Sequence, residues 1–135
     1  MLIKINVTEE LLTDLIITAL EGGSNYWYDL NRDDINMAKK HHHPDVRSSK
    51  ATSELIAISV LNKGFQLPVY ERVEDEDDEQ GDILGYLSKD SIKEGLVLMA
   101  EKDPNNFGSL FIEGWDAVTA DVFFQYVVLK EIVYG

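Results

Sequence analysis

The sequence predicts an α+β fold: a single small domain in which about three main helices pack on a short antiparallel or mixed sheet. A chain of 135 residues is long enough to bury one hydrophobic core, and its 44% of apolar residues is typical of a globular protein. Segments with helical spacing of apolar residues alternate with short β-branched and aromatic runs. No internal repeat and no clear linker divide the chain, so we assign residues 1–135 to one domain.

The N-terminal segment predicts a strand followed by a helix. Residues 2–7 alternate and are β-branched, as in a short strand. Thr8 is suited to cap the helix, and two glutamates follow it in the first turn, where the helix dipole favours them. Glycines 22 and 23 are expected to end the helix, because glycine accepts the left-handed conformation found there. The aromatic segment 24–30 suits a strand. The apolar side chains at helical spacing are Leu12, Leu15, Ile16, Ala19 and Leu20.

The middle of the chain predicts a polar insertion, a helix, a strand and an acidic loop. The variable insertion, about residues 30–50, is expected to hold a short helix before Pro44 and otherwise to be a loop. Residues 52–63 have helical spacing, and Gly64 stops that helix. The segment 65–73 is typical of a strand, which Pro68 would place at a sheet edge because proline cannot donate to a ladder. The loop 71–82 is strongly acidic and is expected to be solvated.

The C-terminal part predicts two helices separated by a short strand. Residues 83–87 suit a strand, and Ser88 can cap the helix that follows. The segment 109–115 suits another strand. Asp116 is a natural N-cap for residues 117–131, which are apolar on nearly all sides, as expected of a buried central helix. The valines and phenylalanines of this segment also suit a strand. Residues 132–135 could pair with the first strand. The apolar stripe of the helix after Ser88 is Ile92, Leu96 and Met99.

The net charge limits the class of partner. The formal charge of −13 disfavours binding to nucleic acid or to anionic membranes, and it favours a basic protein surface. Many acidic soluble proteins carry such a charge without that role. The chain has no cysteine, no apolar stretch near the roughly 20 residues of a membrane span, and no signal-peptide pattern. We therefore expect an intracellular protein that binds neither nucleic acid nor a membrane.

The sequence contains no recognisable catalytic motif. A glycine-rich phosphate loop, a nucleophile elbow and the HExxH pattern are all absent. Carboxylates are numerous, but no pair of them can be assigned as catalytic from spacing alone. We therefore expect a non-enzymatic protein without a cofactor.

A histidine run suggests two further functions. His41, His42 and His43 could ligate a metal, but consecutive side chains point in different directions and a closed zinc site needs a fourth ligand, so we expect no metal site. The tripeptide His43-Pro44-Asp45, which follows two lysines, resembles the signature loop of J-domain co-chaperones. That resemblance implies a co-chaperone mimic that stimulates a heat-shock ATPase, although the first helix of that family has no counterpart here.

The acidic run is a candidate interaction surface. Its carboxylates could imitate a phosphate backbone and occupy the basic channel of a nucleic-acid enzyme, or they could simply be solvated. The residues of this surface are Glu74, Asp75, Glu76, Asp77, Asp78 and Glu79.

The stretch after the first helix is a candidate binding site. Glu21 would lie at a helix C-terminus, where the dipole disfavours an anion, and such local conflicts are more frequent at functional positions. Asn25, Tyr26 and Trp27 combine an amide with large aromatic area, as interfaces and ligand pockets do. The alternative is that the aromatic residues complete the core and that Glu21 accepts backbone N–H groups.

Two blocks of the sequence resemble a family of small uncharacterised bacteriophage and prophage accessory proteins. The first is "TDLIITALEGGSNYW", and the second is "WDAVTADVFFQYVVLKEIVYG", with "GYLSKDSIKEGL" between them. Where that family often has Phe-Gly before its last segment, this chain has Leu129-Lys130. The resemblance implies an accessory protein in the cytoplasm of a bacterial host. Because it runs through both blocks, we predict that residues 21–27 and the Asp116–Asp121 segment are neighbours. The candidate binding residues are Glu21, Asn25, Tyr26, Trp27, Trp115, Asp116, Asp121 and Gln125.

Three functions follow from these observations. The first is a protein that binds and inhibits a host protein, of anti-CRISPR or other anti-defence type, with a basic nucleic-acid-binding defence protein as the partner. The second is a sponge for a signalling nucleotide or another small molecule, with a pocket built from Asn25, Tyr26, Trp27, Trp115 and Gln125. The third is the J-domain-like mimic.

Overall fold

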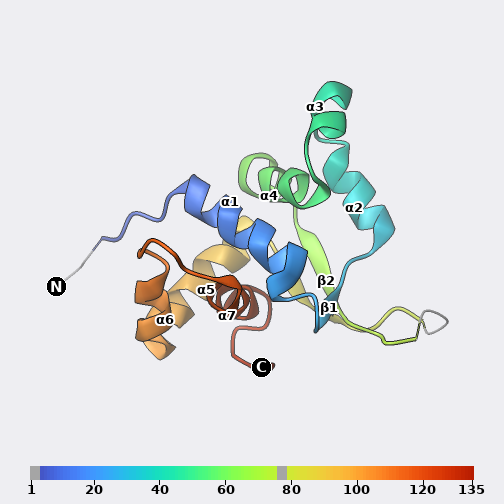
Figure 1. Cartoon of the computed structure of the whole chain (residues 1–135). Helices are drawn as coiled ribbons and strands as arrows, with labels where there is room; N and C mark the ends of the chain where they lie inside the picture. Colours follow the sequence, from blue (N-terminus) through green and yellow to red (C-terminus); the bar gives the residue numbers. More distant parts are fainter. Residues whose placement is uncertain (1–3, 76–78) are drawn as a thin grey trace.

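The computed structural model describes residues 4–75 and 79–135, and in them the chain forms seven α-helices, one π-helical turn and a three-stranded sheet (Figure 1). The predicted α+β class and the antiparallel sheet are confirmed. The α-helices are α1 (Glu9–Thr18), α2 (Arg32–Lys39), α3 (Pro44–Ser49), α4 (Thr52–Lys63), α5 (Lys89–Lys102), α6 (Pro104–Ser109) and α7 (Ala117–Val128). The π-helical turn η1 (Ala19–Gly23) continues α1, and the strands are β1 (Tyr28–Asp29), β2 (Leu67–Glu71) and β3 (Ile83–Leu87).

Helix α7 is the centre of the fold. It packs against α1, α5, α6, η1 and β3, and nearly all of its residues from Thr119 to Val128 are buried. This burial explains why the segment is apolar on nearly all sides. The prediction of a buried central helix is confirmed, and the alternative of a strand is wrong. As predicted, Asp116 caps the helix, and its Oδ1 accepts the backbone N–H of Thr119 at 3.1 Å.

The sheet has the order β1-β2-β3, and both pairings are antiparallel. The predicted position of Pro68 at a sheet edge is wrong, because β2 is the central strand. Proline is tolerated there because β1 is so short: it pairs only with Tyr70 and Glu71, so Pro68 has a strand on one side only among the described residues. Gly85 of β3 lies against the carbonyl of Val128, where a Cβ atom would clash, so the sheet and α7 touch at this glycine.

The ends of the helices follow their predicted signals, with one exception. Thr8 caps α1, Ser88 caps α5 in a capping box with Ser91, and Gly64 ends α4 with φ 69°. The left-handed stop predicted at Gly22 and Gly23 is wrong. Both glycines belong to the π-helical turn η1, and neither has a positive φ. Gly23 is required for another reason: a Cβ atom there would lie 2.8 Å from the carbonyl oxygen of Ala117.

Two short helices were not predicted. The polar insertion contains the expected helix α2, but the segment after it is α3 rather than a loop. Helix α6 likewise follows α5 directly. Both begin with proline at their first position, preceded by an N-cap residue whose side chain accepts a backbone N–H, His43 for α3 and Asp103 for α6.

Two of the predicted strands are not formed in the described residues, and a third is shorter than predicted. Residues 1–3 lie outside the described residues, and 4–7 form neither helix nor strand. Ser109 ends α6 and residues 110–114 form turns and a bend, so the predicted strand 109–115 is wrong. The aromatic segment 24–30 contains a strand, as predicted, but only its two residues Tyr28 and Asp29 form β1. The tail 132–135 pairs with no strand in the described chain, because side-chain bonds from α7 hold it instead. No helix in the described ranges has both the length and the apolar character needed to cross a membrane.

Candidate functional site

The carboxylate of Asp121 on α7 accepts four hydrogen bonds from neutral donors. Its Oδ1 accepts the Ser24 hydroxyl at 2.7 Å and the Trp27 indole N–H at 2.8 Å. Its Oδ2 accepts the Tyr26 hydroxyl at 2.6 Å and the Gln125 amide at 3.1 Å. Only 8% of Asp121 is exposed. These bonds confirm the predicted proximity of the segment after η1 to the Asp116–Asp121 segment.

The four bonds use all the acceptor sites of the Asp121 carboxylate. A carboxylate offers about four lone-pair positions, two on each oxygen, and each oxygen here receives two donors. Three of the donors come from the turn 24–27, so the carboxylate fastens this turn to α7. Asp121 therefore has a structural role, and it has no vacant acceptor position to offer a ligand.

Gln125, one helical turn after Asp121, fastens the C-terminal tail in the same way. Its Oε1 accepts the backbone N–H groups of Val133 and Tyr134, both at 2.9 Å, and its Nε2 donates to the Tyr134 carbonyl at 3.0 Å. The ring of Tyr134 then stacks on Trp27, with centroids 5.5 Å apart and planes 8° from parallel. In the described part of the chain, no buried side-chain nitrogen or oxygen lacks a hydrogen-bond partner. The network of Asp121 and Gln125 is therefore complete.

The phenols of Tyr26 and Tyr28 are held in their neutral form. Burial of the hydroxyl, the hydrogen bond to Asp121 and the negative charge of Asp121 together raise the pKa of Tyr26 to about 12. Although the ring of Tyr26 is half exposed, its hydroxyl is directed at a buried carboxylate, which explains the shift. Burial and the charge of Asp29 raise the pKa of Tyr28 to about 12, and its hydroxyl donates to the Leu20 carbonyl at 2.6 Å. Both hydroxyls therefore remain donors at neutral pH.

A hollow lies beside this network, and we call it the α7 hollow. Its volume is about 480 Å³, and it is open to solvent. Gly22, Gly23 and Asp121 form part of its wall. Most of the remaining lining is apolar or aromatic: Tyr26, Val118, Val122, Ile132 and Tyr134. The bonds of Asp121 and Gln125 place the turn and the tail that form two of its sides.

The predicted ligand pocket is not formed. Trp27 is 2% exposed and belongs to the core. Trp115 lines a separate hollow of about 220 Å³ with Ile112 and Asp116. Asn25 is exposed, and its backbone carbonyl accepts a hydrogen bond from the Arg72 guanidinium. The structure therefore brings together only four of the eight candidate binding residues, namely Tyr26, Trp27, Asp121 and Gln125.

Glu21 has a side-chain partner that the sequence did not predict. Its carboxylate accepts the Ser53 hydroxyl of α4 at 2.6 Å. It lines a further hollow of about 270 Å³ between η1 and the start of α4. The anion is therefore bonded at the helix end, but to a side chain rather than to backbone N–H groups.

The three histidines of the run have three different environments. The buried His42 lies 3.0 Å from both the Leu55 carbonyl and the Ser59 hydroxyl. His41 contacts Phe65 edge to face, and His43 caps α3. No group of metal-ligating side chains is found in the described residues. The divergent directions agree with the geometric argument against a shared metal, and His43-Pro44-Asp45 forms the start of a helix.

The acidic surface is described only in part. Glu74, Asp75 and Glu79 are exposed, as the prediction of a solvated loop requires. Glu76, Asp77 and Asp78 lie outside the described residues.

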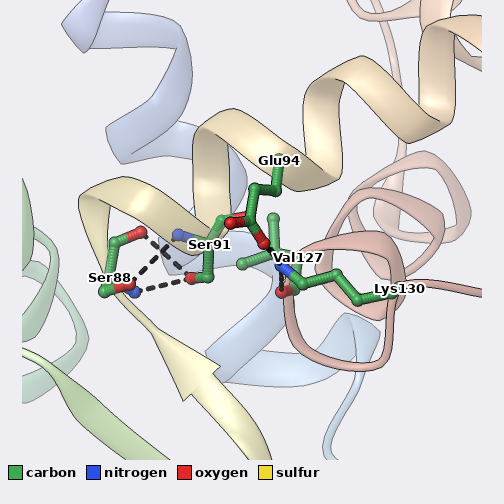
Figure 2. Close-up of polar contacts among 5 residues, drawn as sticks. All are labelled: Ser88, Ser91, Glu94, Val127 and Lys130. Carbon is green, nitrogen blue, oxygen red and sulfur yellow. Dashed lines mark hydrogen bonds and ion pairs between the residues drawn. The ribbon is translucent and has the colours of Figure 1, made fainter.

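A second polar cluster joins the end of α7 to the start of α5, and sequence reasoning did not find it (Figure 2). Lys130 has φ 67°, a left-handed conformation that usually requires glycine. Its Nζ donates to the carbonyls of Val127 at 2.9 Å and Ser91 at 3.2 Å, and it lies 3.3 Å from the Glu94 carboxylate. The three donors of the ammonium are thereby used. Because lysine seldom adopts a left-handed backbone, local sequence rules give no signal for this cluster.

Comparison with protein-family models, with curated proteins and with solved structures finds no match to this chain.

Proposed function

We propose that this chain is a non-enzymatic protein-binding module, and that its binding surface surrounds the first turn of α7. The observation that carries the proposal is the exposure of apolar side chains there. Ile112 and Val118 are 65% and 68% exposed, more than any other large apolar side chain in the described residues. Ile112 borders the hollow that contains Trp115, and Val118 borders the α7 hollow. Exposed apolar side chains beside concave surfaces are typical of interaction sites.

The hydrogen-bond network supports a surface that recognises apolar groups. The side-chain acceptors of Asp121 and Gln125 in the α7 hollow are already occupied. What the hollow offers a partner is mainly the apolar and aromatic area of Tyr26, Val118 and Ile132. A phosphate ligand would need basic donors, and no lysine or arginine lines this hollow. The geometry therefore gives the nucleotide sponge less support than it gives protein binding.

The partner that we propose is a basic bacterial protein. The charge of −13 attracts a basic surface, and the exposed Glu74, Asp75 and Glu79 would speed the encounter. The resemblance to phage accessory proteins supports a role in the cytoplasm of a bacterial host. There the chain would bind and inhibit a host protein of the anti-CRISPR or other anti-defence class.

Affinity capture from a bacterial lysate tests this function when two matched variants are included. Val118→Asp places a charge on the proposed surface, whereas Val97→Asp makes the same change on α5, where Val97 is 54% exposed. Mass spectrometry should identify a basic protein that the native chain and Val97→Asp retain and that Val118→Asp loses. Equal retention by both variants, or the absence of any specific partner, would refute the proposal.

A further inference from the structure

The α7 hollow is electronegative. Asp121 contributes a carboxylate to its wall, and no basic side chain lines it. Gly22 and Gly23 are the last residues of the helix formed by α1 and η1, and helix C-termini carry partial negative charge. Neither α1 nor η1 has a basic residue in its last turn that would offset this charge. Arg72, which bonds to the carbonyl of Asn25 beside the hollow-lining Tyr26, does not itself line the hollow.

Backbone carbonyls add acceptors at this helix end. The last carbonyls of a helix have no partner within it. The Ala19 carbonyl accepts the Ser24 N–H at 2.9 Å, and the Leu20 carbonyl accepts the Tyr28 hydroxyl. Gly22 and Gly23, which follow Glu21, also belong to this helix end and line the hollow. The partial negative charge of this helix end therefore lies at the wall of the hollow.

Two tyrosine rings give the hollow aromatic walls. Tyr26 and Tyr134 both line it, with ring centroids 6.5 Å apart and planes at 88°. Trp27 covers one face of Tyr134, so the opposite face can border the hollow. Aromatic faces attract cations, and this attraction adds to that of a nearby carboxylate. The hollow thus combines aromatic walls, negative charge and apolar rims.

We propose that the α7 hollow binds an arginine side chain of the basic partner, placed against the tyrosine rings with its guanidinium toward the part of the wall formed by Gly22, Gly23 and Asp121. This inference rests on the proposed protein-binding function and names what enters the site. Arginine is favoured over lysine because a planar guanidinium stacks on aromatic rings and donates several hydrogen bonds in one plane. Asp121 contributes its negative charge rather than a hydrogen bond. Apolar neighbours of the arginine would contact Val118 and Ile132.

An NMR titration with short peptides tests the inference without the natural partner. The first probe is the capped peptide Gly-Leu-Arg-Leu-Gly, and the second replaces arginine with citrulline, which has nearly the same shape but no charge. We expect the arginine peptide to shift the backbone signals of Gly22, Gly23 and Tyr26 and to bind about tenfold more tightly than the citrulline peptide. Signals of α2, which lies outside this hollow, should not move.

Two variants of Tyr26 separate the aromatic contribution from the hydrogen bond. Tyr26→Phe keeps the ring and loses the bond to Asp121, whereas Tyr26→Leu loses both. We expect Tyr26→Phe to keep the preference for arginine over citrulline and Tyr26→Leu to lose most of it. Equal affinity for the two peptides would refute arginine recognition while leaving an apolar docking site. The absence of signal shifts at the hollow with either peptide would refute the arginine inference. The capture from a bacterial lysate tests the protein-binding function independently of that result.

Discussion

Replacement of Asp121 by asparagine tests the network most sharply, because it changes one oxygen into a donor and keeps the shape. Four donors converge on the native carboxylate, so the new amide group must face two of them. The Tyr26 and Ser24 hydroxyls can rotate to accept. The Trp27 indole cannot accept at all, and Gln125 cannot turn its amide because its Oε1 already accepts two backbone N–H groups. Either orientation of the asparagine therefore leaves one donor facing another.

The expected loss of stability follows from the number of bonds affected. Two charge-assisted hydrogen bonds are lost or replaced, each worth about 1.5–3 kcal/mol, and the two that remain lose their charged acceptor. We expect Asp121→Asn to lower the free energy of unfolding by about 3 kcal/mol. Urea denaturation followed by tryptophan fluorescence measures this change.

A matched control lies on the same helix. Asp116→Asn makes the same chemical change at the N-cap of α7, where asparagine caps as well as aspartate does, so its effect should stay within about 0.5 kcal/mol. If the two variants lose the same stability, the Asp121 carboxylate does not fasten the turn 24–27 to α7, and our reasoning about this network is wrong.

Three further predictions concern the elements around the network. Gly23→Ala places a Cβ atom 2.8 Å from the Ala117 carbonyl oxygen, and urea denaturation should show a free energy of unfolding lower by about 1–3 kcal/mol. Gly22→Ala is the control, because its Cβ atom would have no atom within 4 Å and should change that free energy little. Similar losses in the two variants would contradict the close packing of η1 on α7. Lys130→Ala and Lys130→Gly both lose the ammonium bonds, but only Lys130→Ala keeps the strain of the left-handed backbone. Thermal melting should therefore show Lys130→Ala to be about 1 kcal/mol less stable than Lys130→Gly. Equal stabilities would argue against strain at Lys130. The raised pKa of Tyr28 means that the folded chain holds the phenol proton more tightly than the unfolded chain does. The stability that this proton contributes is complete below the usual pKa of 10 and is lost as the pH rises toward about 12. Tyr28→Phe should therefore lose less of its free energy of unfolding than the native chain over that pH range.

Local signals in the sequence were sufficient to predict the starts of the main helices, the end of α4 and the central helix. Thr8, Ser88 and Asp116 act as caps. A short polar side chain just before a segment with helical spacing of apolar residues can accept a backbone N–H of the first turn, so its position predicts the start of the helix. The same rule also applied to His43 before Pro44, but the polar composition of that segment made a loop the simpler expectation. Short helices carry too little periodicity to be recognised.

Tertiary contacts decided what the sequence could not. By local rules, Gly23 predicts a left-handed end of the helix, but its φ is not positive. The absence of a side chain instead lets η1 pack closely on α7, which is distant in the sequence. The sequence does not distinguish Trp27 from Trp115 as pocket residues. Only the packing shows that Trp27 belongs to the core and that Trp115 lines another hollow. Asp121 and Gln125 were candidates as binding residues because of the resemblance, and only the structure shows that their side chains are satisfied by the turn 24–27 and the C-terminal tail.

Photo-crosslinking from position 118 tests the central claim, that the surface around the first turn of α7 binds another protein. The photoreactive residue p-benzoylphenylalanine replaces Val118 in one variant and Val97 in the other, and both variants are irradiated in bacterial cells. Our account predicts a discrete crosslinked product with a basic protein from position 118 and none from position 97. A failure to form a product from position 118, or the same products from both positions, would contradict it.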